Sequence, residues 1–264
     1  MVSNNSNEPK ILFWDLENVQ EMRHVFHPGN ILKKRQAGFC SNLAYILVFG
    51  YKWLGKKPEY ITPDRKDFKN IPHDIHTIDK EICRKAIEIL NEADVIVTWY
   101  GDNHDFKFLT GRAAAHGLYL PHNLKHIDLF KVASRQLNLS SNRLDVVARE
   151  FGCETKTPIS HALWPRCWMG DTSALSEMAE YCGQDCAVLE QVYMKLRPLI
   201  KSHPNMRSLL SEDGSRDGCP VCGSVQVVLN GRYATVSGYI YQKLLCTGCQ
   251  HSYKGSRVKF GEGK

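Results

Sequence analysis

The chain has 264 residues and a mass of 30.1 kDa, which is enough for one large domain or two unequal ones. Hydrophobic residues make up 43% and charged residues 23% of it, which excludes a disordered or collagen-like chain. No apolar run approaches the roughly 18 residues of a membrane helix, and the first ten residues lack a signal-peptide pattern. We therefore expect a cytoplasmic protein with no membrane partner.

The net charge of +6 is unevenly distributed along the chain. Residues 201–264 contain nine lysines and arginines but only four acids, whereas the first 200 residues are almost neutral. A basic final quarter favours contact with a polyanion such as a nucleic acid. It is equally typical of a terminus that only keeps the protein in solution.

Up to residue 199, short apolar runs alternate with helical patterns. The runs predict strands at 10–15, 43–53, 59–62, 94–100 and 125–129. The periodic stretches predict helices at 79–92, 105–117, 141–151 (capped by Ser141 or Asn142) and 172–199. Three early strands followed by alternating helices and strands predict an α/β domain, a mixed sheet with helices packed on it.

Beyond residue 200 the pattern changes. The stretch 201–217 is polar, contains Pro204 and Gly214, and is typical of a linker. After it, short β candidates occur at 225–229, 233–236 and 239–245. We therefore expect four parts, namely a disordered N-terminus at 1–9, a large domain at 10–200, a linker at 201–217 and a small β-rich domain at 218–264.

Asp15 and Glu17 stand two residues apart at the end of the first predicted strand. Because side chains alternate along a strand, both carboxylates leave the same face and Leu16 points the other way. Two neighbouring acids repel each other, and a cation between them offsets that cost. Oxygen-only ligands of this kind suit Mg²⁺ or Mn²⁺. The alternative is a strand end that is simply solvated.

Two further acidic positions have a defined place in the predicted elements. Tyr181 and Asp185 are four residues apart in the last long helix, so they share one face beside its apolar stripe. Gly101 to Asp105 forms a strand–turn–helix junction, where ligands of open α/β sheets gather. In isolation, Tyr181 and Asp185 are better explained as a helical tyrosine beside a capping or surface aspartate.

Together, Asp15-x-Glu17, the G-x-N-x-D sequence at 101–105 and Tyr181-x3-Asp185 resemble the three motifs of DEDDy-type 3′–5′ exonucleases. These enzymes form part of the DnaQ-like branch of the ribonuclease H-like superfamily. The chain is most similar to the proofreading exonuclease domain of family B DNA polymerases, and the resemblance covers about residues 10–200. It implies a ribonuclease H-like mixed five-stranded sheet flanked by helices.

The second motif departs from the family pattern. His104 stands where the family usually has Phe, and Asp102 stands where it has an apolar or aromatic residue. Both Asp102 and Asp105 are therefore candidates for the acid of this motif. We assign Asp105, because it opens the following helix and keeps the Phe-x-Phe-Leu sequence in register behind it.

The resemblance implies a two-metal hydrolase. Asp15, Glu17, Asp105 and Asp185 would hold two Mg²⁺ or Mn²⁺ ions about 4 Å apart. Tyr181 would orient the attacking water, and the product would be a nucleoside 5′-monophosphate. Further substrate contacts are assigned to Leu16, Asn103 and Phe106.

Four of the ten cysteines form two C-x2-C pairs, Cys219 with Cys222 and Cys246 with Cys249. Four thiolates on two tight turns are typical of one structural Zn²⁺, held here by a zinc ribbon. An iron–sulfur cluster is the alternative, and the short strands between the pairs favour zinc. We expect metal removal to unfold so small a domain.

The predicted ribbon mixes cations with aromatic residues: Arg232, Tyr233, Tyr239, Tyr241, Lys243, Tyr253, Lys254, Arg257 and Lys259. This mixture suits phosphate contact and base stacking. It equally suits docking to a separate DNA polymerase or another replication or repair protein. We therefore expect a 3′–5′ exonuclease for single-stranded DNA or frayed 3′ ends. The alternatives are an exoribonuclease and a catalytically silent nucleic-acid-binding adaptor.

Overall fold

The structure is a computed structural model that describes residues 9–19, 22–24, 39–42, 44–64, 68, 77–155, 159–210 and 217–258. Nearly all of the N-terminal segment that we expect to be disordered, 1–9, lies outside these ranges, as does Lys259. Among the described helices, none has both the length and the apolar character that crossing a bilayer demands.

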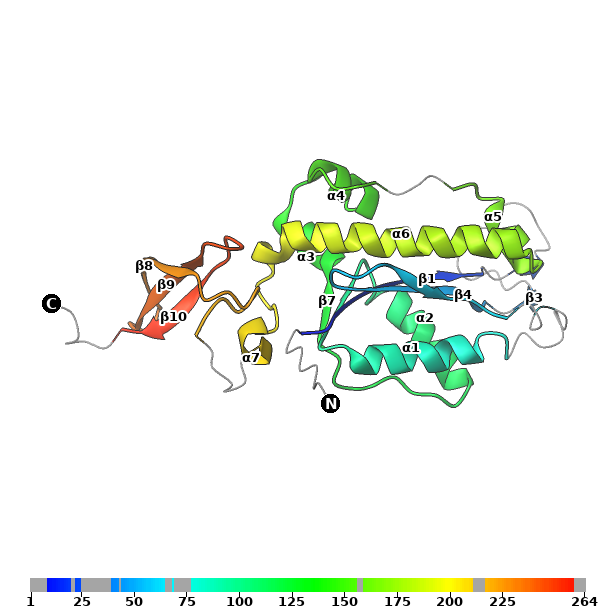
Figure 1. The fold of residues 1–264 in the computed structure, drawn as a ribbon, viewed down its shortest axis with the longest axis horizontal. Coiled ribbons are helices and arrows are strands. Elements are labelled where there is room, and N and C mark those ends of the chain that lie inside the picture. The colour runs from blue at the N-terminus through cyan, green and yellow to red at the C-terminus, as the bar shows by residue number, and fades with distance from the viewer. Residues whose placement is uncertain are drawn as a thin grey trace, which may run out of the picture.

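The large domain is built on a mixed five-stranded sheet (Figure 1). Its strands are β1 (Ile11–Asn18), β4 (Ile46–Trp53), β5 (Glu59–Ile61), β6 (Val95–Thr98) and β7 (His126–Asp128). Their order across the sheet is β5-β4-β1-β6-β7. β1 runs antiparallel to β4 and parallel to β6, β5 is antiparallel to β4, and β7 is parallel to β6. The expected ribonuclease H-like sheet is confirmed.

Helices cover both faces of this sheet (Figure 1). One face carries α1 (Lys80–Glu92) and α2 (Asp105–Ala115). The other carries α6 (Thr172–Leu196), with three shorter helices: α3 (Leu129–Gln136), α4 (Leu144–Glu150) and α5 (Leu163–Trp168). Between β1 and β4 the chain also forms a separate two-stranded sheet of β2 (Met22–His24) and β3 (Phe39–Asn42).

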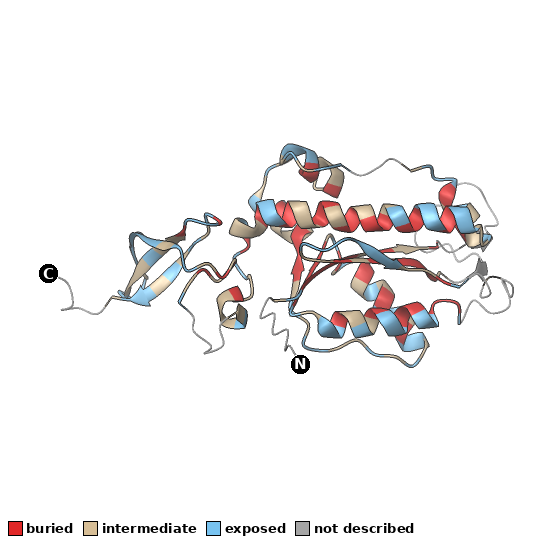
Figure 2. Ribbon diagram, in the orientation of Figure 1, coloured by how far each residue is buried: buried red, intermediate tan, exposed pale blue. Residues whose placement is uncertain are grey.

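The alternation of side chains along β1 divides the core into two halves. Leu12 and Trp14 point to the side of α1 and α2, and Ile11 and Phe13 point to the side of α6. All four are almost completely buried, so β1 is apolar on both faces over its first half. In Figure 2 the buried residues of α6 correspondingly lie along the side that meets the sheet.

Helix α6 can approach the sheet closely because β4 has a glycine beneath it. Gly50 pairs with Asp15 in the neighbouring strand. A Cβ atom at Gly50 would lie 2.6 Å from Cys182 Sγ and 3.2 Å from the Cys182 backbone oxygen. Because Gly50 has no side chain, α6 can pack close to the sheet at Cys182. This brings Asp185, one turn further along α6, near β1.

A buried ion-pair network fixes α1 and α2 to the sheet. The carboxylate of Asp79 accepts two hydrogen bonds from Arg112, both 2.7 Å long, and one from the Ile46 backbone N–H at 2.9 Å. His116 Nε2 lies 2.6 Å from the same carboxylate. Burial alone would raise the pKa of Asp79, but these hydrogen bonds outweigh it and lower the pKa.

The C-terminal domain is a three-stranded antiparallel sheet in the order β10-β9-β8. Its strands are β8 (Val227–Ala234), β9 (Ile240–Cys246) and β10 (Ser252–Arg257). It lies beyond the C-terminal end of α6 (Figure 1). There His251 Nδ1 makes a 2.8 Å hydrogen bond with the backbone oxygen of Pro198, in the short 3-10 turn Arg197–Leu199.

The segment that we expect to link the domains, 201–217, includes the short helix α7 (Met206–Leu210). Met206 is buried in the core of the large domain, and its backbone N–H donates a 2.7 Å hydrogen bond to Pro220 O. Arg207 Nε also donates to the backbone oxygen of Asp217, at 3.1 Å. This segment therefore packs against both domains, although residues 211–216 lie outside the described ranges.

Two local predictions from the sequence are wrong, and one strand has no predicted counterpart. Helix α4 begins at Leu144, not near Ser141, and Ser141 Oγ instead accepts a 3.3 Å hydrogen bond from the extended Arg143. Strand β8 continues through Asn230 and Gly231, because a bulge between Leu229 and Arg232 absorbs them. Strand β10 was not predicted, because its sequence SYKGSR has no apolar alternation.

Candidate active site

Three acids from two distant segments meet on the α6 side of the sheet. Asp15 and Glu17 continue the row of β1 side chains that point to that side, and Asp185 comes from α6. One carboxylate oxygen from each of the three lies within 4.8 Å of the others. Asp185 is 2% exposed, so this cluster lies at the edge of the core and not on open surface. The structure therefore brings together three of the four predicted acids.

Cys182 forms the floor beneath these acids. Its Sγ donates a 3.5 Å hydrogen bond to the Asp15 backbone oxygen and lies 4.0 Å from Asp15 Oδ2. Burial raises the pKa of this thiol well above its usual value, and the charges of Asp15, Glu17 and Asp185 raise it further. Cys182 is thus a neutral packing residue, chiefly because it is buried.

The fourth predicted acid, Asp105, is the first residue of α2 and is 4% exposed. The amide groups at a helix N-terminus favour a carboxylate there. Its Oδ1 lies 3.0 Å from His104 Nδ1, and this hydrogen bond raises the pKa of His104, as does the charge of Glu17. Asp105 is thus connected to Glu17 through His104, and it is not one of the three residues whose oxygens meet within 4.8 Å.

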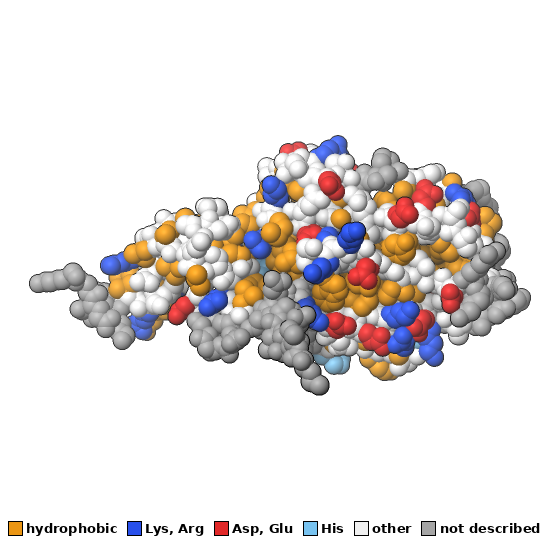
Figure 3. All heavy atoms as spheres, in the orientation of Figure 1, with side chains coloured by type: hydrophobic (Ala, Val, Ile, Leu, Met, Phe, Trp, Pro, Cys, Tyr) orange, Lys and Arg blue, Asp and Glu red, His pale blue; other side chains and the backbone are white. Residues whose placement is uncertain are grey.

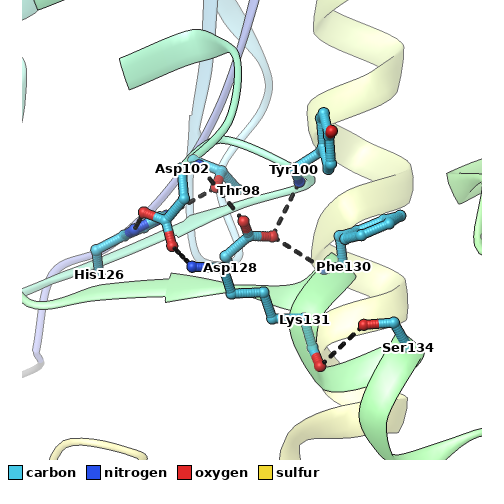
Figure 4. A network of polar contacts seen from close by, with 8 residues as sticks. All are labelled: Thr98, Tyr100, Asp102, His126, Asp128, Phe130, Lys131 and Ser134. Atoms are coloured by element: carbon cyan, nitrogen blue, oxygen red, sulfur yellow. Dashed lines mark hydrogen bonds and ion pairs between the residues drawn. The ribbon is translucent and has the colours of Figure 1, made fainter. Parts of the chain in front are cut away.

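Asp102, the other candidate in this motif, belongs to a different network (Figure 4). Its carboxylate forms an ion pair with Lys131, and its Oδ1 lies 3.0 Å from His126 Nδ1. Burial alone would raise the pKa of Asp102, but the hydrogen bond from Lys131 and the nearby His126 lower it. The protein's own basic side chains thus engage Asp102, which fits a structural role better than metal ligation.

The turn between β6 and α2 is unusually tight. A Cβ atom at Gly101 would lie 2.2 Å from Thr98 Oγ1, so only glycine fits at this position. The preceding residue, Tyr100, has a φ of 68°, which is rare for a non-glycine residue. Its backbone N–H donates a 2.9 Å hydrogen bond to Asp128 Oδ1, which also caps α3 through Phe130 N–H at 3.1 Å (Figure 4).

An open groove of about 590 Å³ lies beside the predicted catalytic tyrosine. Apart from Tyr181, its lining includes Trp99, Tyr100, Phe130, Asn142 and Arg143. The ring of Tyr100 is 43% exposed and packs edge-on against Phe130, with 4.7 Å between the ring centroids. The groove therefore combines exposed aromatic surface with the guanidinium of Arg143, whose side chain is 77% exposed.

The three predicted substrate contacts have different surroundings. Asn103 is exposed in the turn before α2. Leu16 is 4% exposed and belongs to the core on the side of α1 and α2. Phe106 packs against Trp14 and His126 with ring centroids 5.0 and 4.5 Å apart. The side chains of Leu16 and Phe106 thus serve the core on the face away from the acid cluster.

The four cysteines of the C-terminal domain also converge. The Sγ atoms of Cys219 and Cys249 are 3.6 Å apart, as are those of Cys222 and Cys246, and all four lie within 4.8 Å of one another. A disulfide requires about 2.05 Å, whereas the edge of a tetrahedral zinc–thiolate site is about 3.8 Å. The donor set and its spacing therefore fit one Zn²⁺ ion.

Several residues that shape the site were missed in the sequence. Gly50 and Cys182 set the approach of α6, and Asp128 holds the Tyr100 turn. Gly50 lies inside a predicted strand, where an isolated glycine indicates close approach of another backbone. That signal could have singled it out, whereas nothing local distinguishes Cys182 from other core cysteines.

Comparisons with known proteins identify the superfamily of the large domain. A profile of the RNase_H superfamily matches residues 38–197, which is more than half of the chain. The match begins after β1, so it does not depend on Asp15 or Glu17.

Relatives by sequence are DNA polymerases. A DNA polymerase of Methanocaldococcus jannaschii is 31% identical over 157 residues, which cover 51% of this chain and 9% of that protein. DNA polymerase 1 of Pyrococcus abyssi is 26% identical over 145 residues, which cover 46% of this chain and 18% of that protein. The chain thus spans less than a fifth of the length of these relatives.

Among solved structures, the family B DNA polymerase of Pyrobaculum calidifontis superimposes with a TM-score of 0.54 at 17% identity. The superposition covers 81% of this chain and 26% of that polymerase. At this identity the likeness concerns the fold alone.

Proposed function

Because the chain belongs to the RNase H superfamily, we propose that it is a metal-dependent 3′–5′ exonuclease acting on single-stranded DNA or frayed 3′ ends. The observation that carries this proposal is the meeting of Asp15, Glu17 and Asp185 within 4.8 Å. Sequence similarity to DNA polymerases supports DNA as the substrate. The reaction would release nucleoside 5′-monophosphates.

The acid cluster has the chemistry of a site for divalent metal ions. Carboxylate oxygens are the ligands that Mg²⁺ and Mn²⁺ prefer, and neighbouring carboxylates repel one another until a cation lies between them. We propose that Asp15, Glu17, Asp185 and Asp105 together hold two such ions. When bound, the ions would supply an activated water and stabilise the leaving 3′ oxygen.

Tyr181 is placed one turn before Asp185 on α6, and it lines the groove that also contains Tyr100 and Arg143. In this proposal its hydroxyl group holds the attacking water in position by a hydrogen bond. A tyrosine has an ordinary pKa near 10, which suits a hydrogen-bonding role better than that of a general base.

The groove beside Tyr181 is the proposed location of the terminal nucleotides. Its exposed aromatic surface at Tyr100 suits stacking against a base, and the exposed guanidinium of Arg143 suits contact with a phosphate. Both residues lie on the α6 side of the domain, where the acid cluster also lies. The substrate contacts assigned to Leu16, Asn103 and Phe106 remain part of the proposal, through the backbone for Leu16 and Phe106, whose side chains pack into the core on the other face.

The C-terminal domain is proposed to be a zinc ribbon with a structural Zn²⁺ on Cys219, Cys222, Cys246 and Cys249. Thiolate ligands on two turns would fix the loops at one end of the sheet β8–β10. Its proposed role is to engage nucleic acid or a separate DNA polymerase.

The proposed function is tested with labelled oligonucleotides. Single-stranded DNA and RNA of one sequence, labelled at the 5′ end or the 3′ end, are incubated with the protein and Mg²⁺, Mn²⁺ or EDTA. We expect a metal-dependent ladder of shortened 5′-labelled DNA and early release of the 3′ label as a mononucleotide. The Asp185→Ala variant serves as the negative control.

Each other result has a defined meaning. Internal cleavage, or shortening from the 5′ end, contradicts the proposed direction. Faster release from RNA than from DNA would identify an exoribonuclease, whose substrate is distinguished by the 2′-hydroxyl. Binding of oligonucleotides without cleavage under every metal condition would identify an adaptor.

A further inference from the structure

One face of the C-terminal sheet collects the aromatic and basic residues that are dispersed in the sequence. Tyr233 pairs with Tyr241 and Lys254 pairs with Lys243, so these four side chains leave the same face of the sheet. The contacts of Tyr239 and Arg257 add them to that face. We call these six residues the ribbon tyrosine face: Tyr233, Tyr239, Tyr241, Lys243, Lys254 and Arg257.

The aromatic rings and cations of this face hold one another in place. The rings of Tyr233 and Tyr241 stack with centroids 5.7 Å apart and an interplanar angle of 23°. Lys254 Nζ lies 3.5 Å from the centroid of the Tyr241 ring, and Arg257 Cζ lies 3.8 Å from that of Tyr239. The cations are thus positioned above the rings. The face stays accessible to solvent, because Tyr239 is 44% exposed and Lys254 and Arg257 are exposed.

No acid opposes this charge. Residues 218–258 contain four lysines and arginines and no aspartate or glutamate. Figure 3 shows basic side chains set among hydrophobic ones on the visible side of this domain, with acidic colour only at its lower border, whereas acidic and basic side chains are mixed over the large domain. A protein partner would have to bring acidic groups of its own, but a nucleic acid carries negative charge on every nucleotide and offers bases that stack on rings.

We propose that the ribbon tyrosine face binds single-stranded nucleic acid. Lys254 and Arg257 contact phosphates, and the exposed ring of Tyr239 and the flat guanidinium of Arg257 stack against bases. The proposal rests on the proposed nuclease function, because it names a second surface that holds the same strand. From Asp185 to the end of α6 at Leu196 the helix runs for about 16 Å, so this surface would retain a strand well away from the acids.

The test is oligonucleotide binding by the full chain in a buffer without Mg²⁺ or Mn²⁺, followed by fluorescence anisotropy. The probe is an oligothymidylate of about 20 nucleotides, which exceeds the span of a single small binding domain. Tyr239→Ala should weaken binding about fivefold or more, as the loss of one stacked base does. Arg257→Ala should weaken binding and reduce the slope of log K against log salt by about 0.7.

Arg232→Ala is the matched control, because the structure separates Arg232 from the other cations with which the sequence groups it. Arg232 pairs with Gln242, so its side chain leaves the opposite face of the same sheet, and its replacement removes the same charge. We expect this variant to bind with nearly unchanged affinity. The proposal is overturned if Arg232→Ala weakens binding as much as Arg257→Ala. It is also overturned if a DNA duplex of equal length binds as tightly as the single strand, or if neither Tyr239→Ala nor Arg257→Ala changes binding. Zinc content, measured for each variant, shows that the domain is intact.

The result is independent of catalysis, because nothing is cleaved in this assay. Cleavage of a dinucleotide by the unmodified protein, with Mg²⁺, tests the proposed nuclease function separately, since a dinucleotide is shorter than the distance from the acids to the ribbon. Binding without dinucleotide cleavage would retain the ribbon proposal and overturn the nuclease. Cleavage of the dinucleotide, together with equal binding by the Arg257→Ala and Arg232→Ala variants, would retain the nuclease and overturn the ribbon proposal.

Discussion

At the scale of single residues, the acids of the large domain fall into two kinds. Asp79 and Asp102 are engaged by basic side chains of the protein, which lower the pKa of each carboxyl group. Asp15, Glu17 and Asp185 place three carboxylates within 4.8 Å of one another, beside the buried thiol of Cys182. The first kind stabilises the fold, and the second suits an external cation.

The positions of the two motif-two acids lead to a prediction. Asp105→Ala should lower the cleavage rate about 10³-fold or more, because a lost metal ligand removes several kcal/mol of transition-state stabilisation. Asp102→Ala should leave the rate within about tenfold and lower the stability by about 1 kcal/mol, since it breaks a partly exposed ion pair. Cleavage rates and urea unfolding of both variants measure this. The reverse order of rates would make Asp102 the ligand.

Tyr181 offers a second prediction at this scale. Tyr181→Phe removes only the hydroxyl group, so the groove keeps its shape while the proposed partner of the attacking water is lost. We expect kcat to fall about 10²-fold with little change in KM. Steady-state kinetics on a labelled oligonucleotide measures both values. A raised KM with an unchanged kcat would show that Tyr181 binds the substrate and does not assist the chemistry.

The sequence predicts which side chains of the site share a face, because the two members of each pair belong to one element. Asp15 and Glu17 share a strand face, and Tyr181 and Asp185 share a helix face, so local periodicity suffices. The side-chain roles of Leu16 and Phe106 could not be predicted in this way. A strand residue such as Leu16 becomes part of the core only if helices cover its face of the sheet. Those helices come from distant parts of the chain.

At the scale of elements, the position of α6 over β1 and β4 decides whether Asp185 reaches the other acids. The contact depends on Gly50, above which the backbone and Sγ of Cys182 leave no room for a methyl group. Periodicity predicts that α6 is a helix and which side is apolar, but it contains no information about the distance to the sheet. That distance is set by side-chain size at the contact.

We therefore predict that Gly50→Ala destabilises the protein by about 1–3 kcal/mol, as overpacking does. It should also lower cleavage, because α6 moves away from β1. Cys182→Ala removes the nearest atom, so the double variant should be less destabilised than the sum of the two single variants. Chemical denaturation of the four proteins gives this coupling. Strict additivity would mean that Gly50 and Cys182 do not set the packing of α6.

At the scale of the whole molecule, the small domain is attached to the large one by specific contacts. His251 reaches the backbone of Pro198 just after α6, and α7 contacts both domains through Met206 and Arg207. The polar composition of 201–217 predicts a linker. It does not predict these contacts, because they are made by backbone groups and one buried methionine. The expected superfamily is confirmed by the match over residues 38–197, and the fold is shared with a family B DNA polymerase over 81% of the chain.

Loss of zinc should unfold the small domain and leave the large domain folded. Replacing Cys219 and Cys222 by serine should reduce zinc from about one ion per chain to none and unfold the small domain, which has little core of its own. Metal analysis and hydrogen exchange measure this change. Amides of β8–β10 should lose protection while those of β1 and β6 keep it. Full protection of β8–β10 in the zinc-free variant would contradict a structural metal.

The central claim is that acids from β1, α2 and α6 form one site for two metal ions. The most direct measurement is anomalous diffraction from crystals of the protein soaked with Mn²⁺. We predict two peaks about 4 Å apart, one between Asp15, Glu17 and Asp185 and the second adjoining Asp105. Peaks absent from this cluster, or found only elsewhere on the molecule, would contradict the account.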